Sequence, residues 1–296
     1  MRNQTKAYLL TICTVTFWGT AASAFKIALK YVPPYTLLFY SCLFSTIALL
    51  CILTLQNKLG ELATVPARVW QRMALLGFLN PFLYYVVLFK AYAILPGQIA
   101  MSLNYGWPFA LTLLSVPILR QTLSRQQFIA VLISFLGAII IATKGQFTSF
   151  GDVDRFGVLL AACSTFIWAS FWLFNAKDGL DPVLKLFIGF CFGLLYTTLC
   201  SPLFEPLHLV TGKALLPLIY IGLFEMGITF VLWLTALQLT TSAAKIGNMI
   251  YISPFLSLVF LHFIIGEQIH PATFIGLSMI VASIIFQELR RKKTSP

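Results

Sequence analysis

The sequence predicts an all-α membrane protein with ten transmembrane helices, arranged as two inverted repeats of five. Hydrophobic residues make up 59% of the chain and charged residues only 10%, whereas about 25% of the residues in a soluble domain are charged. Apolar runs of the roughly 20 residues that cross a bilayer recur along the whole chain. Because the polar connections between them are short, residues 1–296 are expected to form a single polytopic membrane domain.

The spans are predicted from apolar runs that end at charges, prolines and glycines. The first five are Ala7–Leu29, Tyr35–Leu55, Val69–Tyr92, Gly97–Leu119 and Gln126–Thr143. The second five are Phe156–Ala176, Pro182–Pro202, Leu215–Leu237, Ala243–Ile265 and Pro271–Leu289. If the N-terminus is cytoplasmic, thirteen of the 20 basic residues lie on the cytoplasmic side, so both termini are expected there.

The two halves of the chain repeat each other. Leu9–Thr20 matches Leu159–Ser170 at an offset of 150, and Gly77–Ala91 matches Gly222–Ala236 at an offset of 145. Since five helices are an odd number, the second copy must enter the membrane in the opposite orientation, as in many secondary transporters. Residues 7–143 and 154–289 are therefore predicted to be inverted repeats. The repeat also argues that the first span is retained and not cleaved as a signal peptide, because its partner near Phe156 is internal.

Two prolines fall at equivalent positions within apolar spans. Pro108 in the fourth span and Pro254 in the ninth are related by an offset of 146. Broken helices at a repeat interface can turn their freed backbone groups toward a cavity, and Asn104 and Asn248 lie one or two turns away. We expect helix breaks at a cavity; the alternative is a pair of ordinary kinks, because proline is common in membrane helices.

Glu225 lies near the middle of the eighth span, where an ionised carboxylate costs on the order of 2.5 kcal/mol or more. Two functional roles are open: it takes up a proton to couple transport, or it binds a substrate ammonium group. The alternative is a structural carboxyl group that is protonated or hydrogen-bonded to a neighbouring helix. The repeat equivalent of Glu225 is the uncharged Asn80.

Aromatic residues gather at a similar depth. Trp18 and Trp168 are repeat equivalents, and such rings can stack on a planar substrate or bind a cation through the ring face. Packing or contact with lipid is the alternative for each ring, because aromatic residues make up 15% of the chain. The predicted substrate-binding residues are Trp18, Asn80, Tyr85, Asn104, Tyr105, Trp107, Trp168, Trp172, Glu225, Asn248 and Tyr251, with Pro108 and Pro254 as helix breaks.

Other classes of function lack their motifs. The three histidines form no metal-spaced pair and no HExxH or GxxxxGK[ST] motif occurs, so no metal, cofactor, ATP site or enzyme activity is expected. The six cysteines lie inside apolar runs and are interpreted as packing residues. The net charge of +11 comes from basic residues flanking the spans, which argues against a nucleic-acid partner. Gly189 and Gly193 form a weak GxxxG pattern, which leaves monomer and homodimer open.

Short motifs carry a resemblance to a known family. "FWGT" and "FIWAS" in the first helix of each half, with "NYGWPFALT" and "YISPFLSL" in the fourth, resemble the EamA type of the bacterial drug/metabolite transporter superfamily. The resemblance implies ten helices around a central cavity, an inner-membrane location, and export by alternating access. The Asn-Tyr-x-Trp-Pro run is similar to that of aromatic amino acid exporters within the superfamily, from which this chain departs at Glu225.

The expected function is a secondary transporter that exports small metabolites, with aromatic or other apolar amino acids as the first expectation. An exporter or uptake carrier for another amphipathic metabolite or drug is the main alternative. A membrane-embedded enzyme that modifies lipids is a second alternative, from a different class. The expected partners are therefore a small-molecule substrate and the surrounding membrane lipid.

Overall fold

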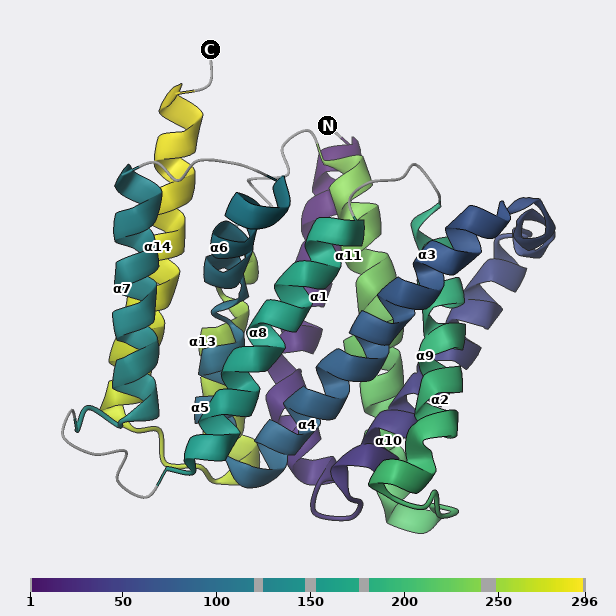
Figure 1. Ribbon diagram of the computed structural model, residues 1–296, viewed down its shortest axis with the longest axis horizontal. Helices are drawn as coiled ribbons and strands as arrows, with labels where there is room; N and C mark the ends of the chain where they lie inside the picture. The colour runs from purple at the N-terminus through teal and green to yellow at the C-terminus, as the bar shows by residue number, and fades with distance from the viewer. Residues whose placement is uncertain (1, 120–124, 147–152, 176–180, 241–248, 295–296) are drawn as a thin grey trace.

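The computed structural model describes residues 2–119, 125–146, 153–175, 181–240 and 249–294, which form a bundle of helices (Figure 1). No strand occurs within these ranges, so the predicted all-α class is confirmed. The first half of the chain contains α1 (Arg2–Ala28), α2 (Pro34–Leu55), η1 (Leu59–Thr64), α3 (Ala67–Gly77), η2 (Phe78–Leu83), α4 (Tyr84–Ile94), α5 (Gly97–Asn104), α6 (Trp107–Leu119) and α7 (Arg125–Ala142). The second half contains α8 (Arg155–Asn175), α9 (Pro182–Phe204), η3 (Gly212–Ala214), α10 (Leu215–Ile221), η4 (Gly222–Gly227), α11 (Ile228–Leu239), α13 (Ser253–Phe260), η5 (Leu261–Ile265) and α14 (Pro271–Thr294).

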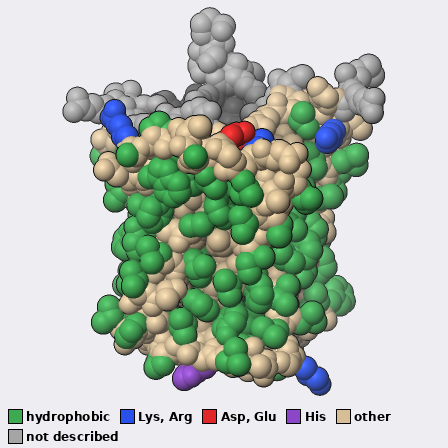
Figure 2. All heavy atoms as spheres, turned by 90° about the vertical axis from the view of Figure 1, so that its right-hand side faces the viewer, with side chains coloured by type: hydrophobic (Ala, Val, Ile, Leu, Met, Phe, Trp, Pro, Cys, Tyr) green, Lys and Arg blue, Asp and Glu red, His purple; other side chains and the backbone are tan. Residues whose placement is uncertain are grey.

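The helices have the length and surface of membrane spans. In the described ranges, seven are long and apolar enough to cross a bilayer: Asn3–Ala28, Pro34–Leu55, Ala67–Ile94, Gly97–Ile118, Arg155–Phe174, Pro182–Phe204 and Gly212–Leu239. Three shorter apolar helices lie at the remaining predicted positions: Phe128–Ala142, Ser253–Ile265 and Pro271–Phe286. Figure 2 shows apolar side chains over the middle of one face and charged ones at its two ends. A multi-pass membrane protein follows, while the exact count of ten spans stays a prediction.

Helices of the two halves pack against each other and not only within a half. α1 packs on α11 and α13, α2 packs on α9, and α4 packs on α8. These contacts are reciprocal under the repeat, because α1 corresponds to α8 and α4 corresponds to α11. Figure 1 places the start of α1 and the end of α14 at the same end of the bundle. Pairing across the halves creates an interface along the centre of the molecule.

The start of α9 is fixed by Asp181 and Pro182. The Asp181 carboxylate accepts hydrogen bonds from the backbone N–H groups of Val183 at 3.0 Å and Leu184 at 3.1 Å, and Pro182 occupies the first turn. Its other oxygen forms an ion pair of 2.7 Å with Lys58, which precedes η1. Burial acts to raise the pKa of the Asp181 carboxyl group, but the hydrogen bonds from Lys58 and from the two backbone groups outweigh it and hold the pKa below its usual value.

The third predicted span of each half changes from α-helical to π-helical geometry in its middle. η2 joins α3 to α4, and η4 joins α10 to α11; the two segments are repeat equivalents at the offset of 145. Inside η2, Asn80 has a non-helical backbone with φ −150° and ψ 121°. Such local π geometry is frequent at functional positions. The predicted pair Asn80 and Glu225 therefore lies at two matching helix interruptions.

Side chains of α1, α2 and the adjoining start of α11 donate hydrogen bonds to carbonyl groups of η4. The Ser45 hydroxyl donates to the carbonyl of Gly222 at 2.6 Å, and Thr229 donates to the carbonyl of Phe224 at 2.5 Å. The indole N–H of Trp18 donates to the carbonyl of Glu225 at 3.4 Å. Away from water, a carbonyl group freed from the helix needs such partners. These bonds hold the backbone that carries Glu225.

The fourth and ninth predicted spans are both interrupted. α5 ends at Asn104, a turn follows at residues 105–106, and α6 starts at Trp107 with Pro108 in its first turn. In the second half a turn at residues 251–252 precedes α13, which has Pro254 in its first turn. Proline is tolerated in a first turn because its missing N–H would have no partner there. The two turns differ by the repeat offset of 146.

Candidate functional site

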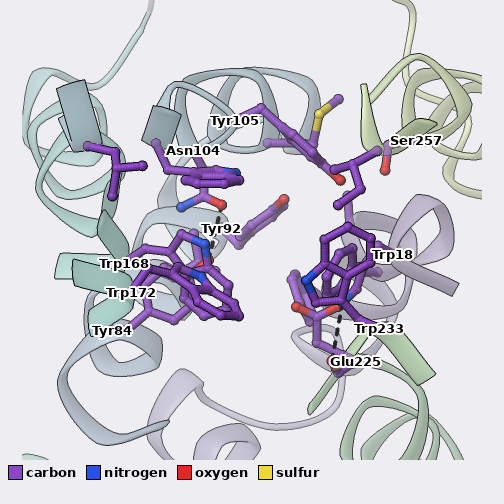
Figure 3. Close-up of a pocket in the computed structure, with 18 of the residues that line it drawn as sticks. Trp18, Tyr84, Tyr92, Asn104, Tyr105, Trp168, Trp172, Glu225, Trp233 and Ser257 are labelled. Atoms are coloured by element: carbon purple, nitrogen blue, oxygen red, sulfur yellow. Dashed lines mark hydrogen bonds between the residues drawn. The ribbon is translucent and has the colours of Figure 1, made fainter. Parts of the chain in front are cut away.

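A cavity of about 300 Å³ lies at the interface between the two halves. Figure 3 shows its side chains converging from helices of both repeats. The cavity is mostly apolar, as small-molecule sites usually are. Its lining residues in the described ranges are Trp18, Ala21, Ala22, Phe25, Tyr84, Leu88, Tyr92, Met101, Asn104, Tyr105, Trp107, Leu111, Trp168, Trp172, Glu225, Trp233, Leu237, Ile250 and Ser257.

Aromatic rings form two opposing walls of the cavity. On one side, Trp168 of α8 lies 4.6 Å from Tyr84 of α4 and 5.8 Å from Trp172 between ring centroids. On the other side, Trp18 of α1 lies 6.1 Å from Trp233 of α11 (Figure 3). The walls are related by the repeat, since Trp18 corresponds to Trp168. A planar or apolar group would contact ring surfaces on both sides.

Glu225 is the one charged residue among the lining residues that the structure describes. Its Oε1 accepts a hydrogen bond of 3.2 Å from the Tyr85 hydroxyl, and its Oε2 is buried without a hydrogen-bond partner. Figure 3 places Glu225 beside Trp18 and Trp233. A buried acceptor without a partner is costly, so an ammonium group or a proton at this carboxylate would be stabilised.

Polar lining residues form hydrogen bonds at the end of α5, where the fourth predicted span is interrupted. The side-chain oxygen of Asn104 accepts from the Tyr84 hydroxyl at 3.1 Å, and its amide nitrogen donates to the Ser164 hydroxyl at 2.9 Å. The Tyr105 hydroxyl donates to the Ser253 hydroxyl at 2.8 Å. These bonds connect the end of α5 to α4, α8 and α13. Asn104 and Tyr105 thus position the break while they face the cavity.

The structure brings seven of the predicted substrate-binding residues to this cavity: Trp18, Asn104, Tyr105, Trp107, Trp168, Trp172 and Glu225. Tyr85 is fully buried and lies behind Glu225 as its hydrogen-bond donor. Asn80 lines a separate chamber of about 190 Å³ with Lys185 and Gly189, and its amide has no partner in the described structure. Tyr251 is absent from the described lining, and Asn248 lies outside the described residues.

Several lining residues were not predicted from the sequence, namely Phe25, Tyr84, Leu88, Tyr92, Met101 and Trp233 among others. A signal for part of this set exists. Tyr84, Leu88 and Tyr92 follow one another at intervals of four residues, which places them on one helix face. Trp233 and Leu237 are the repeat equivalents of Leu88 and Tyr92 at the offset of 145. Helical spacing combined with repeat symmetry would have found them.

The described residues contain no group of three or more His, Cys, Asp or Glu side chains that could hold a metal ion. The chemistry available at the cavity is therefore that of one carboxylate, several hydroxyl and indole groups, and aromatic faces. This arrangement can bind and orient a small amphipathic molecule.

Comparisons with known proteins agree with this fold. The model of the EamA-like transporter family matches residues 5–143 and again residues 155–287. The chain is 24% identical over 295 residues to the uncharacterized transporter YvbV of Bacillus subtilis, covering 98% of this chain and 93% of that protein. It is 25% identical to protein PecM of Dickeya dadantii, covering 76% of this chain and 77% of that one. A crystal structure with 22% identity superposes with a TM-score of 0.68 over 98% of this chain and 99% of its own, which supports the fold.

Proposed function

Because the chain belongs to the EamA-like transporter family, we propose that it is a secondary transporter that exports small amphipathic metabolites by alternating access. The first candidates are amino acids with aromatic or other apolar side chains. One observation carries the proposal: the cavity between the halves combines two aromatic walls with a single described carboxylate. We also propose a bacterial inner-membrane location with both termini in the cytoplasm, as the distribution of basic residues favours.

The cavity suits a molecule with an amino group and an apolar body. Glu225 would pair with the ammonium group, and the rings of Trp18 and Trp168 would contact the apolar part from opposite walls. The volume of about 300 Å³ lies at the lower end of the range for small-molecule sites. A substrate of amino-acid size therefore matches the space better than a large drug or a lipid.

The same carboxylate supplies a means of coupling. A proton and a substrate ammonium group would compete for Glu225, so each state of the carrier would hold one or the other. Exchange of the two across the membrane would link export to a proton gradient. Tyr85 would keep the carboxylate oriented toward the cavity through its hydrogen bond.

A second candidate substrate class is an aromatic amine without a carboxylate. The described lining holds no lysine, arginine or histidine that could pair with the carboxylate of an amino acid. Tryptamine and phenethylamine are therefore matched probes for tryptophan and phenylalanine. The direction of net movement would follow the imposed gradients, so an uptake carrier is tested by the same assay.

The test is flux of labelled tryptophan, phenylalanine, threonine and tryptamine in proteoliposomes, with and without a pH gradient. The wild type is compared with Glu225→Gln. Glu61→Gln is the matched control, because it makes the same chemical change on the exposed segment η1. We expect Glu225→Gln to lower substrate flux at least about tenfold, the effect of losing a charge-assisted contact, and to abolish the response to pH.

The outcomes separate the parts of the proposal. Flux of the probes in the wild type and its loss only in Glu225→Gln would support substrate binding at Glu225, and a response of wild-type flux to the pH gradient that Glu225→Gln lacks would support proton coupling. Equal flux in the two variants, with an unchanged pH response, would make Glu225 a structural residue. Absence of flux for every amino acid and amine would reject the proposed substrate class.

A further inference from the structure

One end of the bundle is joined across the two halves by a small polar cluster. The cluster lies at the end opposite to the chain termini, where Figure 1 shows the start of α5 and the segment before α14. We call Lys26, Gln98 and Glu267 the distal clasp. Lys26 and Gln98 come from the first half, and Glu267 comes from the segment between η5 and α14 of the second half.

Glu267 holds the first turn of α5. Its Oε1 accepts a hydrogen bond from the backbone N–H of Gly97 at 2.7 Å, and its Oε2 accepts one from the N–H of Gln98 at 3.1 Å. The first N–H groups of a helix lack partners within the helix, and a carboxylate there is favoured by the helix dipole. The cap of α5 is therefore supplied by the other repeat, 169 and 170 residues away in sequence.

The side chain of Gln98 forms three hydrogen bonds, all with atoms of the second half. Its amide nitrogen donates to the carbonyl of Gln268 at 2.9 Å. Its side-chain oxygen accepts from the backbone N–H of His270 at 2.9 Å and from the Thr273 hydroxyl at 3.0 Å. Gln98 is only 7% exposed, so these bonds are shielded from water.

A close approach makes these contacts possible. A Cβ atom at Gly97 would lie 2.8 Å from Leu261, 3.1 Å from the Glu267 carboxylate and 3.2 Å from the Lys26 side chain. A side chain at position 97 would have to displace Leu261 and the clasp side chains, so glycine allows α5 to approach the other half closely. The Lys26 ammonium group completes the cluster, because it donates to the carbonyl oxygens of Tyr92 and Leu95 at the end of α4, at 3.1 Å each.

The distal clasp lies directly beyond the cavity. Phe25, which precedes Lys26, and Tyr92, whose carbonyl binds Lys26, both line the cavity. Met101 lies one turn after Gln98 on α5 and also lines it. In an opening in which α5 moves away from residues 267–273, the start of α5 loses its contacts with the second half. That separation breaks five hydrogen bonds between the halves at once.

The inverted repeat does not reproduce the clasp side chains. At the offset of 146, the equivalent of Glu267 is the neutral Gln121, and the equivalent of Gln98 falls at Ala243 or Ala244, depending on where the offset changes. An inverted repeat with identical ends would have equal preference for its two access states. The Glu267 carboxylate and the Gln98 amide therefore have no side chain of the same type in the other copy, and the two ends differ in sequence.

We propose that the distal clasp is the gate at this end of the transporter and that it makes the state closed at this end the resting state. The proposal rests on alternating access in the proposed function. Glu267 and Gln98 bias the equilibrium between the two access states, and a bound substrate must overcome that bias before it can leave at this end.

The test measures access to the cavity without any substrate. A reporter cysteine is placed at Ala21, which lines the cavity, in a chain whose six native cysteines are replaced. A membrane-impermeant thiol reagent is added from each side of vesicles whose orientation is read from a C-terminal tag. We expect Glu267→Gln to raise the labelling rate from the clasp side about tenfold, as for loss of charge-assisted bonds, and to lower it from the other side.

A second clasp variant and a control variant complete the test. Thr273→Val removes one hydrogen bond to Gln98 with little change of shape, and we expect an increase of about threefold from the clasp side. Glu61→Gln is the control and should label at wild-type rates. If Glu267→Gln does not fold, Thr273→Val carries the test.

Labelling at wild-type rates from the clasp side in both Glu267→Gln and Thr273→Val would overturn the gate. A rise from both sides together would also overturn it, because that result indicates general loosening of the fold. Since no substrate is used, failure of the flux assay and failure of this assay are separate results.

Discussion

Two π-helical segments occupy equivalent positions in the two halves but carry different side chains at the centre of each segment. η2 contains Asn80, and η4 contains Glu225. Glu225 lines the central cavity, whereas Asn80 lines a separate chamber. The Glu225 carboxylate accepts a hydrogen bond from Tyr85, while the Asn80 amide has no partner in the described structure. Both halves therefore have an interrupted helix at this position, but one places an amide there and the other a carboxylate.

Both segments begin at a close helix crossing between the halves, although Asn80 gives η2 a non-helical backbone in its middle. A Cβ atom at Gly222 would lie 2.6 Å from Phe44 and 2.8 Å from the carbonyl of Ser41, both on α2 of the other half. At the equivalent Gly77, a Cβ atom would collide with the carbonyl of Gly189 on α9. Each segment therefore crosses a helix of the opposite half at a glycine. A close crossing with the opposite half therefore accompanies the interruption in each repeat, while Asn80 and Glu225 give the two segments different chemistry.

The largest effect is expected at these two glycines. Gly77→Val and Gly222→Val should each destabilise the protein by about 3 kcal/mol, because the added methyl groups overpack a helix crossing. Thermal unfolding in detergent measures the change, with Gly60→Val as a control, since nothing lies within 4 Å of a Cβ atom there. A loss of stability in only one of the two variants would show that the two crossings are not equivalent.

A smaller effect is expected where the halves differ. Tyr85→Phe removes the hydrogen bond to Glu225 and leaves the carboxylate less well oriented. We expect the apparent affinity for an aromatic amine to fall about fivefold, the equivalent of about 1 kcal/mol for one hydrogen bond. Tyr196→Phe is the control, because the Tyr196 hydroxyl donates to the carbonyl of Ala74 away from the cavity. Equal effects of the two variants would argue against a special role for Tyr85.

Asn80 offers the converse prediction. Asn80→Leu replaces an amide without a described partner by an apolar group of similar size. The protein should keep its flux and gain up to about 1 kcal/mol of stability, because a buried unsatisfied polar group is costly. Flux and thermal unfolding measured on the same preparation give both answers. A loss of flux as large as that of Glu225→Gln would show that the halves are functionally equivalent after all.

The smallest effect is expected at the ion pair between Lys58 and Asp181, which lies outside both segments. Because the pKa of Asp181 is lowered in the folded protein, the associated stability is present above about pH 4, the range of an unfolded aspartate. It is lost as the pH falls through the lower pKa of the folded state. Asp181→Asn should remove this part of the pH dependence, worth at most about 1 kcal/mol for a partly exposed pair.

Thermal unfolding of the wild type and Asp181→Asn across the acidic range checks this expectation. The two curves should converge at low pH and separate toward neutral pH. Parallel curves at every pH would mean that the ion pair adds nothing to stability.

Local properties of the sequence were enough to predict the class of fold. Hydropathy is a sum over neighbouring residues, so the apolar helices could be located before their packing was known. Matching stretches at nearly constant offsets exposed the repeat, and Glu225 stood out because an acidic residue in the middle of a span is rare. The interruptions before Pro108 and Pro254 also follow locally, because proline removes a backbone donor.

Tertiary packing decided which side chains meet. Tyr84 and Tyr85 are neighbours in sequence, yet successive helical positions point about 100° apart, so one lines the cavity and the other supports Glu225 from behind. Only the crossing of α4 with its neighbours determines which is which.

The same limit applies to longer distances along the chain. The Glu267 carboxylate binds Gln98 across 169 residues, and no local pattern records such a pair. The sequence by itself determined the helices, their repetition and the rare buried acid, because these depend on near neighbours. The cavity walls and the distal clasp were decided only when the two halves packed together, because burial and hydrogen bonding depend on the partner helix.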